Sequence, residues 1–273
     1  MKDRVVRILE ILSANQNIRI KLLAEMLNVT LITIRKDLEI LEKLGIICRT
    51  RGHISLDGAN VTAKRIAINY LIKRRIAKAA AQIVEEGESV IIESGSCCAM
   101  LAEELAILKK NINIVTNSVF IVNYVSKLHS IRINLLGGYF QAESEVLIGP
   151  MTKSCAEQIY SQKYFLGTDG FIPEFGFTGG DQFCAEIAEE LTNHAKDVYI
   201  LTEASKFNRQ GPYKQIHFDK ITGVFTDDSI SKEAEDTLIK NNIRLHKIST
   251  VDEKEEKLKW NQFSGQYPFL YKK

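Results

Sequence analysis

Seven short apolar segments between residues 89 and 248 limit the possible folds of this chain more than any other feature. The candidate strands are residues 89–93, 112–116, 131–136, 163–168, 197–202, 221–226 and 243–248. Helical segments separate most of them, and nearly continuous apolar strands with helical crossovers are typical of a parallel sheet covered on both faces. We therefore expect a doubly wound, mostly parallel α/β domain.

Small, polar or glycine-containing loops follow several of these strands. Because parallel strands end at the same edge of a sheet, the loops are expected to lie together, where helix N-termini offer backbone N–H groups to an anion. Each loop alone is an ordinary turn, but their recurrence predicts a ligand crevice with a phosphate near Ser96. The loops are Ser94-Gly95-Ser96, Asn117-Ser118, Gly137-Gly138, Asp169-Gly170 and Ser205-Lys206.

The first 57 residues have a different pattern, with helical periodicity first and alternation at the end. Residues 4–13 and 20–27 predict two helices joined by a loop, and a tight turn leads to a third helix at 29–45. Residues 46–56 predict a β-hairpin. Short helices joined by a tight turn and followed by a hairpin indicate a winged helix-turn-helix domain.

The third helix, residues 29–45, has two different faces. Its apolar stripe is formed by Ile34, Leu38 and Leu41, and the opposite side carries Ile32, Lys36, Glu39 and Lys43. Thr30 is a suitable N-cap whose hydroxyl can accept from the backbone N–H of Ile32 or Thr33. One face is thus expected to pack on a core and the other to contact a partner.

Charge is divided unevenly along the chain. The first 75 residues carry 15 Lys and Arg against 7 Asp and Glu, a net charge of +8, whereas the remainder carries 21 against 27, a net charge of −6. A basic N-terminal part followed by an acidic remainder suggests that the N-terminal part binds a polyanion, although charge alone would favour a solvated basic helix surface.

The segment from Leu23 to Gly52 resembles the winged-helix signature of the DeoR family of bacterial transcriptional regulators. The family's TIRRDL motif corresponds here to residues 33–38, read as TIRKDL; Thr30 replaces the usual Ser, and His53 replaces a second wing glycine. We expect Ile32 to pack on a thymine methyl and the basic residues to contact bases or phosphates. The expected DNA-binding residues are Thr30, Ile32, Thr33, Arg35, Lys36, Lys43, Arg49 and Arg51.

The following residues, to about 248, resemble the effector domain of the same family, which is similar to ribose-phosphate isomerase and binds phosphorylated sugars or their relatives. The family's phosphate loop corresponds to residues 93–97, and its Asp-x-Ser-Lys-Phe motif to residues 203–207. Cys184-Ala185 and Ala188-Glu189 depart from the family pattern. The resemblance implies an effector site formed by Glu93, Ser94, Gly95, Ser96, Cys97, Thr116, Asn117, Ser118, Gly137, Gly138, Asp169, Gly170, Asp181 and Lys206.

These observations predict a DNA-binding regulator, a repressor, whose partners are a double-stranded DNA operator and a small phosphorylated sugar or polyol. We expect a homo-dimer or homo-tetramer, because symmetric operators require two heads. The first alternative is a phosphosugar isomerase with Asp169 as general base and Lys206 as its electrophilic partner. The second is a non-catalytic scaffold, which would bind neither DNA nor sugar phosphates.

The expected domains are residues 1–57, a linker and helix at 58–75, the α/β domain at 76–250 and a charged, aromatic tail at 251–273. No metal or cofactor is expected, because the five cysteines include no CxxC pair and the five histidines show no ligand spacing. No run of eighteen apolar residues occurs and the N-terminus is charged, so we expect a cytoplasmic protein without membrane contact.

Overall fold

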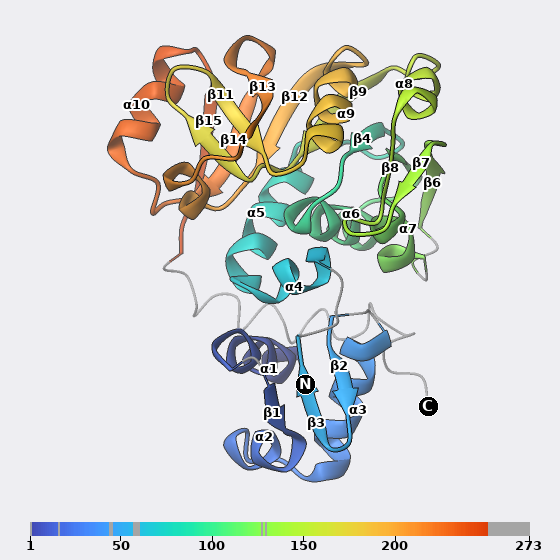
Figure 1. Cartoon of the computed structure of the whole chain (residues 1–273), viewed down its shortest axis with the longest axis vertical. Coiled ribbons are helices and arrows are strands. Elements are labelled where there is room, and N and C mark those ends of the chain that lie inside the picture. The colour runs from blue at the N-terminus through green and yellow to red at the C-terminus, as the bar shows by residue number, and fades with distance from the viewer. Residues whose placement is uncertain are drawn as a thin grey trace. The chain divides into compact units, whose positions relative to one another are not determined.

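The computed structural model describes residues 2–15, 17–43, 46–56, 61–126, 128 and 130–250 (Figure 1). The chain divides into two compact units, Met1–Leu71 and Ile72–Lys273. The expected tail at 251–273, and residues 57–60 at the boundary between the expected first domain and the linker, lie outside the described residues. Within the described ranges, no helix is long and apolar enough to cross a membrane.

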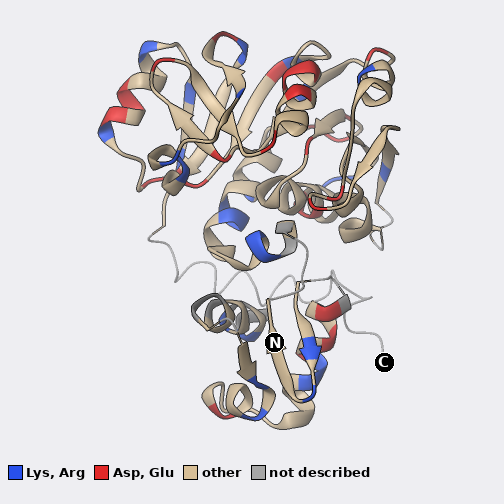
Figure 2. Cartoon of the chain, viewed as in Figure 1, with Lys and Arg blue, Asp and Glu red and all other residues tan. Residues whose placement is uncertain are grey.

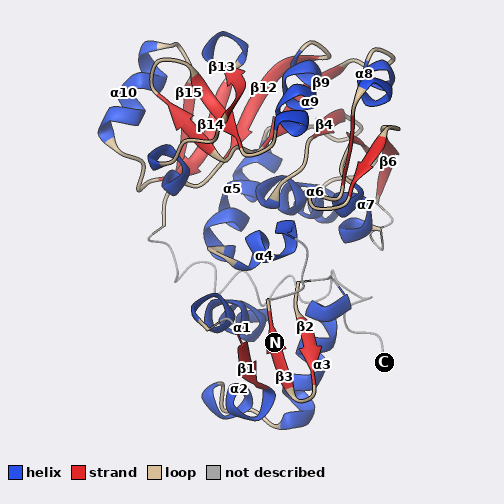
Figure 3. Cartoon of the chain, viewed as in Figure 1, coloured by secondary structure: helices blue, strands red, loops and turns tan. Residues whose placement is uncertain are grey.

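The first unit combines helices with a small antiparallel sheet (Figure 3). Its elements are α1 (Lys2–Ala14), β1 (Asn17–Arg19), α2 (Ile20–Met26), α3 (Leu31–Lys43), β2 (Cys48–Thr50), β3 (His53–Ser55) and α4 (Val61–Ala67). The sheet has the order β1-β3-β2. The prediction of a loop between the first two helices, at residues 14–19, was wrong in part, because β1 lies inside this segment. A strand of three residues is too short to be recognised from alternating apolar and polar residues.

Apolar stripes of the helices form the core of this unit. Ile8, Leu9 and Leu12 of α1 are fully buried, as are Ile34 and Leu38 of α3. One charged pair shares this core, since the buried carboxylate of Asp37 on α3 accepts a hydrogen bond from Arg4 Nη2 at 3.0 Å. The interaction orders α1 against α3 and raises the pKa of Arg4 through the hydrogen bond to Asp37.

The second unit is built on a seven-stranded parallel sheet with the order β15-β14-β12-β9-β4-β5-β6. Its strands are β4 (Ser89–Ile92), β5 (Ile112–Thr116), β6 (Ile131–Leu135), β9 (Ser161–Leu166), β12 (Ala195–Leu201), β14 (Gly223–Asp227) and β15 (Arg244–Ile248). They are the seven strands expected from the sequence, with ends that differ by at most two residues. Every pairing in the sheet is parallel, which confirms the expected α/β architecture.

Helices join these strands and cover the sheet. They are α5 (Tyr70–Gln82), α6 (Ser96–Leu108), α7 (Val119–Val125), α8 (Pro150–Ala156), α9 (Gln182–Thr192) and α10 (Lys232–Lys240), with short 3-10 helices η1 (Ala204–Asn208) and η2 (Phe218–Lys220). Alternate strand residues such as Tyr164 and Ile200 pack in one cluster with Leu191 of α9 and Leu238 of α10. That cluster is the core of one face of the sheet.

Two antiparallel additions were not predicted from the sequence. A hairpin of β7 (Tyr139–Gln141) and β8 (Val146–Ile148) follows β6, and a small sheet has the order β10-β11-β13, formed by Gly170–Ile172, Gly176–Gly179 and Tyr213–His217. The missed strands are short, and several contain glycine, which hides apolar alternation. Both additions lie beyond the carboxyl ends of parallel strands and shape the candidate site.

Candidate functional site

The structure gives helix α3 one buried and one exposed face, as expected. Thr30 Oγ1 accepts a hydrogen bond from the backbone N–H of Thr33 at 3.2 Å, which confirms the N-cap, and lies 2.9 Å from the Thr33 hydroxyl oxygen. Ile32 is 71% exposed, and Arg35 and Lys36 are exposed beside it. An apolar side chain and two cations therefore share the face that can enter a DNA groove.

The hairpin of β2 and β3 forms the wing, and its two arginines differ. Arg51 is exposed at the tip of the turn. Arg49 is half-buried, pairs with Glu42 at 3.0 Å, and its Nη2 donates to the backbone carbonyl of Arg35 at 3.1 Å. Arg49 thus fastens the wing to α3, while Arg51 remains accessible to a phosphate. Figure 2 shows the basic segments of α3 and the wing in blue. The side chain of Lys43 lies outside the described part of the chain.

In the second unit, the expected phosphate loop joins β4 to α6 at the carboxyl edge of the sheet. Gly95 is the N-cap residue at φ +120°, a conformation that L side chains rarely adopt. The helix begins at Ser96 itself, and both Ser96 and Cys97 are buried in its first turn. The loop also touches the strand beside it, because Gly167 lies against the backbone of Ser94. A glycine-capped helix start of this kind can bind an anion through backbone N–H groups.

Glu93 is buried directly before this loop. Burial, together with a smaller contribution from the charge of Asp169, raises its pKa from 4.5 to about 7, although hydrogen bonds with Ser94 oppose the shift. The Ser94 hydroxyl donates to Glu93 Oε1 at 2.7 Å. A carboxyl group with this pKa exchanges its proton close to neutral pH, so the site loses a negative charge on mild acidification.

Two ion pairs lie near the first turn of α6. Lys73 on α5 pairs with Glu203 at 3.3 Å, and Lys206 pairs with Asp169 at 3.4 Å. Burial raises the pKa of Cys97 to about 12, while the positive charges of Lys73 and Lys206 act in the opposite direction. Both ammonium groups are therefore near enough to Cys97 to act on an anion at the helix start.

Lys73 was missed by the sequence analysis, which assigned its segment to a linker and helix. Its ammonium is almost fully buried, and burial lowers its pKa although Glu203 opposes the shift. The signal was present: Lys73 lies on the same helical stripe as the buried Ile76, Ala77 and Ala80. A lysine on an apolar stripe needs a partner inside the fold.

A second group of expected site residues follows β5 and β6. Thr116 accepts from the backbone N–H of Ser118, and Ser118 caps α7, so both hydroxyls have structural partners. Asn117 is fully buried; its Nδ2 donates to Leu147 O at 3.1 Å, while Oδ1 has no hydrogen-bond partner in the described structure. An acceptor of this kind fits a ligand hydroxyl.

Of the expected double glycine, Gly138 is required for close packing. A Cβ atom on Gly138 would lie 2.0 Å from Thr152 Oγ1 and 2.8 Å from Ile148 O, so any side chain there displaces the start of α8. Thr152 was not singled out from the sequence. Its hydroxyl is buried and, among the described residues, also lacks a hydrogen-bond partner. Gly137 has more space, because a Cβ atom added there would lie 3.5 Å from Cys155 Sγ.

The remaining expected residues have defined positions at the same edge. Asp169 Oδ2 accepts from the backbone N–H of Gly180 at 3.0 Å, and Gly170 packs against the backbone of Arg209.

Asp181 caps α9 and accepts from Gln141 Nε2 at 3.0 Å. Burial raises the pKa of Asp181, but hydrogen bonds from Cys184 and Gln141 outweigh this and hold it below its usual range. Asp181 therefore stays ionised.

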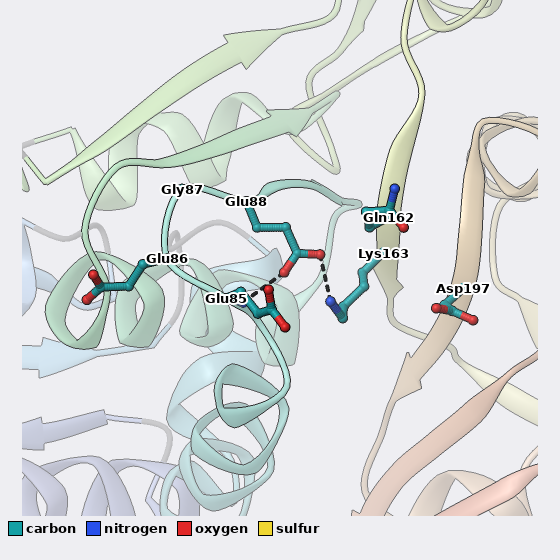
Figure 4. A pocket seen from close by; sticks show the side chains of 7 residues that line it. All are labelled: Glu85, Glu86, Gly87, Glu88, Gln162, Lys163 and Asp197. Atoms are coloured by element: carbon teal, nitrogen blue, oxygen red, sulfur yellow. Dashed lines mark hydrogen bonds and ion pairs between the residues drawn. The ribbon is translucent and has the colours of Figure 1, made fainter.

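An open pocket of about 370 Å³ lies at the opposite edge of the sheet (Figure 4). It is lined by Glu85, Glu86, Gly87, Glu88, Gln162, Lys163 and Asp197. The Lys163 ammonium pairs with Glu88 at 2.6 Å, which leaves an excess of carboxylates. This pocket repels anions and does not fit a phosphorylated effector. The phosphate loop at the carboxyl edge is the better candidate.

Known families match both units. A family model described as the DeoR C terminal sensor domain matches residues 68–228, and one described as the DeoR-like helix-turn-helix domain matches residues 4–58. The two matches together cover the winged helix, the phosphate loop and the carboxyl edge of the sheet.

Individual relatives are similar over most of their length. The lactose phosphotransferase system repressor of Staphylococcus epidermidis (strain ATCC 35984) is 25% identical over 83% of this chain and 92% of that protein. The HTH-type transcriptional repressor GlcR of Bacillus subtilis (strain 168) is 26% identical over 89% and 95%. Among solved structures, ribose 5 phosphate isomerase A from Neisseria gonorrhoeae has 18% identity and a TM-score of 0.38, covering 50% of this chain and 52% of that chain.

Proposed function

Because this chain belongs to the DeoR family of transcriptional regulators, we propose that it represses transcription by binding an operator. A phosphorylated sugar or polyol that binds its second unit then lowers or raises its affinity for the operator. Its relatives include a repressor of the lactose phosphotransferase system. The proposal assigns DNA binding to the first unit and effector binding to the carboxyl edge of the second.

The capped helix α3 supports the DNA-binding part. Ile32, Arg35 and Lys36 project from its exposed face, and the apolar stripe behind them is buried. In this arrangement Ile32 packs on a thymine methyl and Arg35 donates to a base edge. Thr30 and Thr33 present the helix start to a phosphate, and Arg51 adds a phosphate contact that gives affinity without sequence reading.

The observation that carries the effector-binding part is the helix start of α6 between two lysines. A phosphate there accepts from the backbone N–H groups of the first turn and is attracted by Lys73 and Lys206. Both lysines are already paired with carboxylates, so an effector competes with Glu203 and Asp169 for them. Such competition converts ligand binding into a rearrangement of the site.

Polar groups farther along the edge suit the rest of a sugar or polyol. The unsatisfied Asn117 Oδ1 accepts from a hydroxyl, and the ionised Asp181 accepts from another. This combination favours an effector with one phosphate and several hydroxyl groups over a simple anion. Its carbon skeleton extends from α6 toward α8 and α9.

Effector binding then regulates DNA binding through thermodynamic linkage between the two sites. An effector that binds one arrangement of two sensor units more tightly than another changes the spacing of two DNA-binding heads. A palindromic operator requires that pair of heads, so the active form is a homo-oligomer.

The isomerase alternative has less support. Asp169 would be its general base, yet one of its oxygens faces the ammonium of Lys206 and the other accepts from Gly180 N. A carboxylate held in this way is better suited to bind than to remove a proton.

A paired experiment tests the proposal. DNA fragments upstream of the chain's own gene are expected to shift on a gel with an affinity that falls steeply with salt. A thermal-shift screen of sugar and polyol phosphates identifies the effector, and the stabilising compound is expected to change the gel shift. Lys73→Met is expected to abolish the thermal response, whereas Lys163→Met, in the acidic pocket, serves as the matched control. Absence of binding to any genomic fragment would refute the proposal.

A further inference from the structure

An exposed apolar surface lies at one end of the second unit, beside the candidate effector site. We name it the β7–α8 face; it consists of Leu135, Tyr139, Phe140, Met151 and Phe183, which are between 42% and 73% exposed. Monomeric proteins rarely leave aromatic and large aliphatic side chains gathered in this way. The face is therefore a candidate interaction site.

The five residues lie on elements that follow one another in the chain or contact one another. Leu135 ends β6, and Gly138, directly before Tyr139, packs against Thr152, the neighbour of Met151. At the other end of β7, Gln141 lies within hydrogen-bond distance of Cys184 and Asp181, which flank Phe183. Figure 1 shows β6, β7, β8 and α8 gathered at this end of the unit.

We propose that a second copy of this chain docks on the β7–α8 face across a twofold axis. This inference rests on the proposed function, which requires two DNA-binding heads. In a twofold interface both copies use the same face, so the apolar centre of the face on one copy contacts the apolar centre of the same face on the other.

The size of the face fits this partner. Its exposed apolar parts sum to roughly 600 Å², since a large apolar side chain presents about 150–250 Å². A stable dimer buries about 800 Å² on each partner, with an apolar centre and a polar rim. The face therefore supplies the centre of an interface of standard size.

The charges around the face also fit a second copy. Lys153 and Glu186 form an exposed pair at 3.4 Å on α8 and α9, the two helices that carry Met151 and Phe183. A rim with both signs of charge is complementary to itself, because Lys153 of one copy can meet the same acid of the other. A nucleic acid would instead require an excess of positive charge.

Strand β6 adds a backbone contribution. It is the last strand of the sheet, and no strand pairs with its outer side among the residues that the structure describes. Unpaired backbone groups of such an edge favour pairing with another chain. An antiparallel pairing of β6 with its symmetry mate is compatible with the same twofold axis.

The position of the β7–α8 face links the association of two copies of the chain to effector binding. Gln141 belongs to β7 and is bound to Asp181, a candidate effector ligand. A ligand that attracts Asp181 thus acts directly on the hairpin that carries Tyr139 and Phe140. This is how a change in the sensor site reaches the relative positions of two copies.

The first test compares oligomeric states of the full chain by sedimentation velocity over a range of concentrations. Tyr139→Ser with Met151→Ser is expected to raise the dimer dissociation constant by about 30-fold or more, because central aromatic and methionine contacts carry much of the binding energy. Ile239→Ser is the control: Ile239 is 56% exposed on α10, which packs on β15 at the opposite end of the sheet. A wild-type chain that stays monomeric, or a double variant that still dimerises like the control, overturns the proposal.

A second test does not depend on folding of a double variant. A photo-crosslinker replaces Phe140, and labelled and unlabelled chains are mixed so that crosslinks between copies are distinguished by mass. Crosslinks to residues of α8 or β7 of another copy support the proposal. Crosslinks to residues 251–273 of the same chain overturn it, because that segment would then be the occupant of the face.

Gel shifts with the same variants separate this inference from the proposed function. If the wild-type chain dimerises through the face but binds no genomic fragment, the proposed function fails and the interface stands. If DNA binding is intact and the double variant remains dimeric, the interface fails and the function stands.

Discussion

The two units place their candidate functional side chains in opposite environments. Ile32, Arg35 and Lys36 project from an exposed helix face, whereas Lys73 and Glu93 are buried next to the start of α6. In the first unit, the apolar stripe on the opposite side of the same helix supports the fold, so Ile32, Arg35 and Lys36 can bind a partner without contributing to folding. In the second, the charged groups that bind a ligand also take part in folding, because each needs a partner inside the protein. Substitutions therefore separate binding from stability only in the first unit.

The largest expected effect is that of Lys73→Met, which tests whether binding and stability are joined in the second unit. Removing one member of a buried ion pair costs about 3–5 kcal/mol, so the variant is expected to unfold at clearly lower urea concentration and to lose its response to phosphorylated compounds. Urea unfolding followed by thermal shift measures both effects.

The double variant Lys73→Met with Glu203→Gln provides the control. It removes both charges, so stability is expected to return in large part while the response to phosphate stays absent. If the double variant also regains the phosphate response, Lys73 has no part in effector binding.

Glu93→Gln tests, through the pH dependence of unfolding, whether a buried charged group of the candidate effector site also contributes to stability. The folded-state pKa of about 7 lies above the ordinary value of 4.5, so the folded protein binds the extra proton and its stability falls as pH rises from about 4.5 to about 7. This loss amounts to at most about 3 kcal/mol. The glutamine variant lacks it, so its unfolding free energy is expected to change less between about pH 5 and about pH 8.

Burial holds the pKa values of Cys98, Cys184 and Tyr164 above their usual ranges, so these neighbours of Glu93 stay protonated between about pH 5 and about pH 8 in both proteins. The difference between wild type and Glu93→Gln therefore reports on Glu93 and on the charge of Asp169 that acts on it. Equal pH profiles for the two proteins would show that the pKa of Glu93 does not differ between the folded and the unfolded state.

The difference between the units also explains what the sequence predicted. Helical periodicity identified Ile34 and Leu38 as core and Ile32 and Lys36 as exposed, because both properties depend on one helix alone. The seven sheet strands were found for a similar reason, since a strand buried on both faces is apolar along its length. The carboxyl edge followed from the strands, since parallel strands have a common direction.

Contacts between distant segments were not predictable in the same way. Helical periodicity does not reveal that Arg4 binds the buried Asp37, and the alternation of the wing does not reveal that Arg49 binds Glu42. Each pairing joins residues on different elements and depends on packing angles that periodicity does not contain. Lys73 was missed because its segment was assigned to a linker and helix outside the α/β domain. The hairpin of β7 and β8 was missed because its strands are only three residues long.

Arg35→Ala is expected to have an intermediate effect and to separate binding from stability in the first unit. Loss of a base contact costs about 1–3 kcal/mol, or about 10-fold to 100-fold in operator affinity. Its side chain is exposed, so the urea midpoint is expected to stay unchanged. Gel shifts on a specific and a scrambled fragment measure the effect, with Lys21→Ala, an exposed cation on α2, as control. Equal losses on both fragments would show that Arg35 contacts phosphate and reads no base.

Arg51→Ala is expected to have the smallest effect, and it distinguishes the two wing arginines. Arg51 is exposed at the wing tip, so its loss removes one phosphate contact and reduces the slope of log affinity against log salt by about 1, with little change in specificity. Arg49→Ala instead loosens the wing from α3, because Arg49 binds Glu42 and the carbonyl of Arg35. That variant is expected to lower stability slightly and to weaken binding without the same change in slope. If both variants change the salt slope equally, Arg49 leaves Glu42 when DNA binds, and the wing moves on the operator.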